Sequence, residues 1–101
     1  MSIKKQILKT KPVCKVSFKV GKAEAGGATK VAILGDFNGW NPSVDLMSPL
    51  KDGSFSHTIE LETGNSYQFR YLADDRRWFD EAEADSHAAN EFGALNNVII
   101  L

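Results

Sequence analysis

Residues 54–73, SFSHTIELETGNSYQFRYLA, contain two runs in which apolar and polar side chains alternate, separated by Thr63-Gly64-Asn65. The apolar face of the first run is formed by Phe55, His57, Ile59 and Leu61, and that of the second by Tyr67, Phe69 and Tyr71. Successive side chains of a strand point to opposite faces, so this period of two predicts two β-strands, each with one buried face. Gly64 lies between them in a segment of turn-forming residues.

The rest of the chain extends the same pattern. VCKVSFKV (13–20) alternates cleanly and places Cys14 among its apolar residues, which predicts a buried, unreactive thiol. Further strands are predicted at 30–35, at Trp78-Phe79 after a hairpin tip at 74–77, and at 96–101. Residues 21–30 and 80–94 are predicted to be loops. Short strands at such spacing predict an all-β fold, an immunoglobulin-like antiparallel β-sandwich.

The length of 101 residues fits a single domain. We place residues 1–12 in a basic N-terminal arm and residues 13–101 in the sandwich. Residues 1–30 carry eight lysines against one acidic residue, Glu24. A basic segment can bind nucleic acid, but lysines that alternate with apolar residues are typical of an exposed edge strand, so a nucleic-acid partner is not expected.

The sequence has no apolar run long enough for a membrane span or a signal peptide, so we expect a cytoplasmic protein without a membrane partner. The single cysteine excludes an internal disulfide. The acidic residues between Asp80 and Asp85 lack the glycine of a calcium loop, and no nucleophile elbow or phosphate-binding loop occurs. We therefore expect no catalytic residues, no metal and no cofactor.

Two tryptophans stand beside turns: Trp40 follows Asn38-Gly39, and Trp78 follows the tip at 74–77. An indole there either caps the core or binds something. An indole face stacks well on the C–H face of a pyranose ring, and Arg70 and Asn96 offer hydrogen bonds that suit sugar hydroxyls. Whether both rings are exposed on one surface distinguishes these two interpretations.

Three blocks carry a family resemblance: GDFNGWNP (35–42), YQFRYLADDRRW (67–78) and FGALNNVIIL (92–101). They resemble, in order and spacing, carbohydrate-binding module family 48. That family includes the glycogen-binding domain of the AMP-activated protein kinase β subunit and the N-terminal early-set domain of isoamylases. The resemblance runs from about Cys14 to Leu101 and implies the same early-set sandwich.

The resemblance also implies a carbohydrate site. Trp40 and Trp78 correspond to the glucan-stacking tryptophans, and Arg70 falls where the kinase domains have a sugar-bonding lysine. Asn96 matches an asparagine that bonds sugar hydroxyls, and Phe92 falls where the kinase domain has a leucine lying against the glucan. Ala94 replaces a hydroxyl-bearing residue of the family.

Two functions follow as hypotheses. In the first, the chain is a non-catalytic module that holds an α-1,4-glucan such as glycogen, starch or a malto-oligosaccharide through Trp40, Arg70, Trp78, Phe92 and Asn96. In the second, it is an interaction or scaffold domain that docks on a glycogen- or starch-processing enzyme without binding sugar itself.

Overall fold

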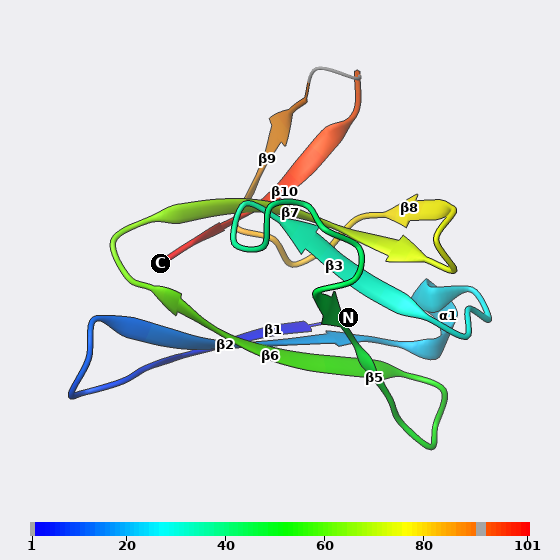
Figure 1. The fold of residues 1–101 in the computed structure, drawn as a ribbon, viewed down its shortest axis with the longest axis horizontal. Coiled ribbons are helices and arrows are strands. Elements are labelled where there is room, and N and C mark those ends of the chain that lie inside the picture. The colour runs from blue at the N-terminus through cyan, green and yellow to red at the C-terminus, as the bar shows by residue number, and fades with distance from the viewer. Residues whose placement is uncertain (1, 91–92) are drawn as a thin grey trace.

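The chain forms two antiparallel sheets packed face to face (Figure 1). The structure, a computed structural model, describes residues 2–90 and 93–101. Its elements are β1 (Ser2–Ile7), β2 (Val13–Val20), α1 (Lys22–Ala25), β3 (Val31–Gly35), β4 (Asp45–Leu46), β5 (Ser48–Pro49), β6 (Phe55–Glu62), β7 (Ser66–Ala73), β8 (Arg77–Phe79), β9 (Ser86–Ala89) and β10 (Leu95–Ile100).

The first sheet, here sheet 1, has the strand order β1-β2-β6-β5. The second, sheet 2, has the order β4-β3-β7-β10-β9, with β8 paired to β7. The expected all-β, immunoglobulin-like sandwich is confirmed. The two strands of residues 54–73 belong to different sheets, because β6 pairs with β2 and β5 while β7 pairs with β3 and β10. The turn at 63–65 therefore carries the chain from one sheet to the other.

The core lies between the sheets and is filled by the inward residues of the alternating strands. Phe18, Phe69 and Tyr71 are fully buried and meet edge to face, with centroids 5.2 and 5.8 Å apart. Such geometry is the favoured one for aromatic pairs. Cys14 is buried as expected, with a free thiol.

Besides the two-residue strands β4 and β5, which the sequence does not predict, three segments differ from the sequence prediction. Residues 2–7, placed in a basic arm, form β1, which pairs with β2 over its whole length. The strand is hard to predict from the sequence because the charged Lys5 lies on the same strand face as Ile3 and Ile7, which interrupts the apolar pattern. Ile3 packs against the core, and the Lys5 ammonium binds Asp85, 2.6 Å away.

The other two differences lie in predicted loops. Residues 22–25 form the single helical turn α1, which ends at Gly26 in a left-handed conformation (φ 61°). Residues 86–89 form β9 because they pair with β10, although SHAA itself has no strand-like alternation. The predicted strand at Trp78-Phe79 is confirmed within β8, which forms a hairpin with β7. In the described part of the chain, no helix has the length and apolarity to cross a membrane.

Candidate functional site

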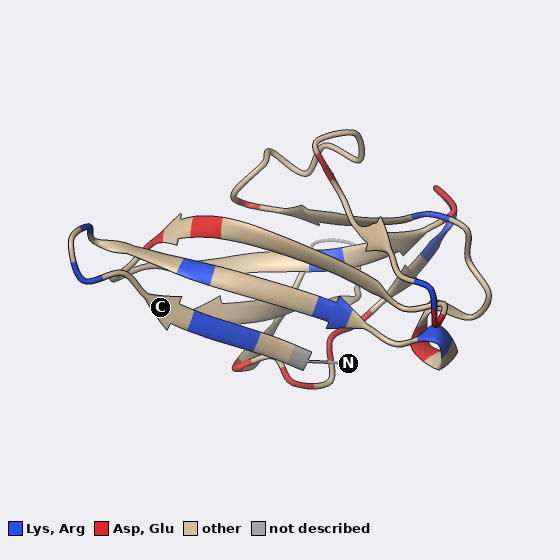
Figure 2. Cartoon of the chain, turned by 90° about the horizontal axis from the view of Figure 1, so that it is seen from below, with Lys and Arg blue, Asp and Glu red and all other residues tan. Residues whose placement is uncertain are grey.

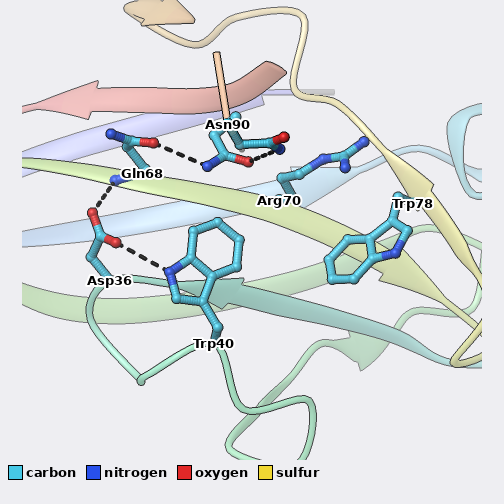
Figure 3. A pocket seen from close by; sticks show the side chains of 7 residues that line it. Asp36, Trp40, Gln68, Arg70, Trp78 and Asn90 are labelled. Atoms are coloured by element: carbon cyan, nitrogen blue, oxygen red, sulfur yellow. Dashed lines mark hydrogen bonds between the residues drawn. The ribbon is translucent and has the colours of Figure 1, made fainter. Parts of the chain in front are cut away.

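The outer face of sheet 2 holds an open pocket of about 650 Å³ (Figure 3). Its lining residues come from the loop after β3 and from strands β7, β8 and β10 with the turn beside β9. They are Asp36, Trp40, Gln68, Arg70, Trp78, Asn90 and Asn96.

Strand periodicity places these side chains outside the core. On β7, Phe69 and Tyr71 point inward, so Gln68, Arg70 and Leu72 point outward. Trp78 is the pairing partner of Leu72 and shares its face. On β10, Asn97 and Ile99 are fully buried, which turns Asn96 outward.

Trp40 rests on a small apolar cluster of its own on the outer face of sheet 2. The cluster consists of Ala32, Leu34 and Leu72, all buried, and explains why β3 is apolar on both faces. The indole Nε1 donates a hydrogen bond to Asp36 Oδ1, 3.1 Å away. Trp40 also has a positive φ of 59°, which is unfavourable for a residue with a large side chain.

Asn38 holds the backbone that carries Trp40. Its Oδ1 accepts from the N–H groups of Gly35 (3.0 Å) and Trp40 (3.1 Å). Its Nδ2 donates to Ile33 O (2.9 Å) and to Asp45 Oδ2 (2.7 Å). Four hydrogen bonds from one half-buried side chain fix the direction in which the indole leaves the loop.

Trp78 and Arg70 form a stacked pair at the other part of the pocket. The Arg70 Cζ lies 5.2 Å from the centroid of the Trp78 ring, within the range of a cation–π contact. Trp78 is 43% exposed. The Arg70 Nε is buried and lies 3.4 Å from Asp80 Oδ1, an ion pair without hydrogen-bond geometry. Within the described residues, that Nε makes no hydrogen bond.

Three amides form a chain along one wall of the pocket (Figure 3). Asn90 Nδ2 donates to Asn96 Oδ1, and Asn96 Nδ2 donates to Gln68 Oε1, both at 3.0 Å. The backbone of Gln68 in turn donates to Asp36 Oδ2 at 2.9 Å, which links this wall to the carboxylate that holds Trp40.

Of the five residues expected in the site, Trp40, Arg70, Trp78 and Asn96 line this one pocket. Phe92 lies outside the described residues. The sequence reasoning missed Asp36, Gln68 and Asn90. The first two lie inside the recognised GDFNGWNP and YQFRYLADDRRW blocks, which is a signal that could have found them. Asn90 follows a strand that the local sequence does not predict.

The described lining consists of groups that can stack and hydrogen-bond. Among the described residues, the pocket presents two indoles, an arginine and three amides, and Asp36 is the one carboxylate in this described part of the lining. Glycoside hydrolysis ordinarily needs two carboxyl groups flanking the bond. Among residues 2–90 and 93–101, no three His, Cys, Asp or Glu side chains are grouped so that they could hold a metal ion.

Comparison with known families gives one result. The family model described as the glycogen recognition site of AMP-activated protein kinase matches residues 24–101, a stretch that includes every lining residue of the pocket. A search of the curated proteins gives no match.

Proposed function

The chain belongs to the family described as the glycogen recognition site of AMP-activated protein kinase, and from this we propose that it is a non-catalytic module that holds an α-1,4-glucan on the outer face of sheet 2. The observation that carries the proposal is the meeting of Trp40 and Trp78 in one pocket. They come from elements separated by more than thirty residues, and each ring has one side seated on protein: Trp40 on the apolar cluster, Trp78 against Arg70.

Two seated indoles suit a row of glucose units. A pyranose ring presents a C–H face that buries apolar area against an indole while its hydroxyls point outward. A ring already held by protein loses little freedom when the sugar stacks on it, so little of the stacking energy is lost to ordering. An open site of this kind has a dissociation constant between micromolar and millimolar, which corresponds to a binding free energy of about 4–8 kcal/mol.

Arg70 supplies hydrogen bonds beside the rings. A guanidinium carries five N–H donors in a planar fork, which matches adjacent hydroxyl oxygens. In the described part of the chain Arg70 contacts Asp80 and Trp78 but makes no hydrogen bond, so its exposed donors are available to a ligand.

Titration with maltoheptaose and with a cyclic malto-oligosaccharide, followed by calorimetry, tests the proposal. We expect Trp78→Ala, at an exposed position, to weaken binding about tenfold or more, and Trp40→Ala with Trp78→Ala to abolish measurable binding. Leu50→Ala, which removes an exposed apolar side chain outside the pocket, is the matched control and should bind as the wild type does.

Thermal unfolding of each variant shows whether loss of binding reflects loss of the fold. Binding by a folded double variant at wild-type affinity would refute the proposed site. A folded wild-type chain that binds neither ligand would refute the function itself and favour the alternative, a domain that docks on a glucan-processing enzyme.

A further inference from the structure

The direction of the amide chain in the pocket is fixed from one end. Ala94 N donates to Asn90 Oδ1, 3.1 Å away. A backbone N–H can only donate, so the oxygen of Asn90 must face Ala94 and its nitrogen must face away. Asn90 Nδ2 therefore donates to Asn96 Oδ1, which turns Asn96 Nδ2 toward Gln68 Oε1.

This order leaves a defined group at the far end. With Oε1 accepting from Asn96, the free end of Gln68 is Nε2, which carries two N–H donors and no acceptor. Gln68 is half-buried and lines the pocket, and its Nε2 has no hydrogen-bond partner within the residues that the structure describes. A polar group in such a place is stabilised by a ligand that accepts its hydrogen bond.

Asn96 is placed differently. It is 7% exposed, and both ends of its amide are used within the chain, one by Asn90 and one by Gln68. Its geometry suits alignment of Gln68 more than contact with a sugar.

We propose that Gln68 is a specificity-determining residue that donates to an oxygen of the bound glucan through Nε2, and that Asn96 is a positioning residue acting through Gln68. The inference rests on the proposed function. Arg70 beside it also offers only donors, and both oxygens of Asp36 already accept, from Trp40 Nε1 and from Gln68 N. This part of the pocket therefore recognises acceptor oxygens of the sugar.

Three variants separate contact from alignment. Gln68→Glu keeps an oxygen for Asn96 but loses the donors, and Gln68→Met keeps the length without either; both should bind maltoheptaose about fivefold to tenfold more weakly. Asn96→Ala removes the donor to Gln68 Oε1 without placing a competing acceptor beside it, and should cost less than Gln68→Met because the Gln68 donors remain. Thermal unfolding confirms that each variant is folded.

A panel of maltotriosides, each lacking one hydroxyl, gives a readout that a structural role would not move. For at least one deoxy sugar, the wild type should bind it more weakly than it binds maltotriose. Gln68→Met should bind that deoxy sugar and maltotriose equally well. Wild-type affinity in both Gln68 variants, or a greater loss in Asn96→Ala than in Gln68→Met, would overturn the inference while glucan binding stands. If the wild type binds no maltoheptaose at all, the proposed function itself fails.

Discussion

Trp40 has an unfavourable backbone conformation, and Asn38 keeps it there. A positive φ at a bulky residue costs about 1–3 kcal/mol and persists only where surrounding contacts enforce it. The four hydrogen bonds of Asn38 are those contacts, and they reach from β3 through the loop to Asp45 on β4. An indole presented in this way is already oriented before any ligand arrives.

Asn38→Ala should therefore lower the free energy of unfolding by about 2–4 kcal/mol, since a net contribution near 1 kcal/mol is typical of each hydrogen bond lost. Urea denaturation measures the change. Asn41→Ala in the same loop removes one exposed bond, to Ser43 N, and should cost less than about 1 kcal/mol. Equal losses in the two variants would contradict the role given to Asn38.

The same loop illustrates what the sequence could predict about the site. Trp40, Arg70 and Trp78 were found because their side chains are unusual in turns or on an outward strand face. Gln68 is not predicted, because a glutamine on the polar face of a strand carries no signal by itself. Its importance comes from the hydrogen-bond chain through Asn96 and Asn90, which depends on the pairing of β10 with β9. Such pairing is a tertiary fact that the residues 86–89 do not signal.

At the scale of elements, strands with a clean period of two were predictable and those formed by pairing alone were not. Residues 13–20 and 66–73 became β2 and β7 because burying their apolar face is favourable wherever they pair. β9 is short and mostly exposed, and it exists because β10 offers free backbone groups along its edge. Sequence alone could not show that edge.

The connection between β8 and β9 is anchored by a buried carboxyl group. Glu81 is fully buried, and its Oε1 accepts from the Tyr71 hydroxyl at 2.7 Å while its Oε2 accepts from Glu83 N at 2.9 Å. Its own N–H donates to Asn97 Oδ1. Burial raises the pKa of Glu81, because desolvation disfavours the charged form more than these hydrogen bonds favour it. Burial, with the neighbouring Glu81, also raises the pKa of Tyr71.

A pH dependence of stability follows, with a definite sign. Since the folded state holds the Glu81 proton more tightly than the unfolded state, its contribution is fully present below the ordinary value of 4.5 and declines as the pH rises through the raised pKa. Relative to Glu81→Gln, which stays neutral, the wild type should lose stability from about pH 4.5 to neutrality. Urea denaturation across this range measures the difference.

Glu60→Gln, at an exposed position of β6, is the control for the loss of one negative charge. A stability difference between wild type and Glu81→Gln that does not change with pH would refute the prediction.

At the scale of the whole molecule, the pocket and the lysine-rich face belong to different sheets. The pocket lies on the outside of sheet 2, whereas lysines follow β1, β2 and the turn between them in sheet 1 (Figure 2). Lys5 on β1 connects sheet 1 with the chain of sheet 2, since its ammonium contacts Asp85 Oδ2 at 2.6 Å and the Ile100 carbonyl oxygen on β10 at 3.1 Å. Although burial opposes ionisation of Asp85, the Ile100 N–H and Lys5 outweigh it and hold its pKa below the ordinary value.

Removal of residues 1–8 tests whether β1 belongs to the sandwich. An arm outside the domain could be removed without cost, but β1 pairs with six residues of β2, and Ile3 packs on the core. We expect the truncated chain to lose about 2–4 kcal/mol of unfolding free energy, from apolar area returned to water and backbone bonds lost at the new edge. Hydrogen exchange should accelerate at the β2 amides that face β1. Maltoheptaose affinity should stay within about twofold, because none of the described residues that line the pocket lies in sheet 1. Lys5→Ala in the full chain removes the contacts with Asp85 and Ile100 alone and should account for a minor share of the loss, since exposed ion pairs contribute little. An unchanged free energy of unfolding after truncation would instead support the prediction that residues 1–12 are an arm outside the sandwich.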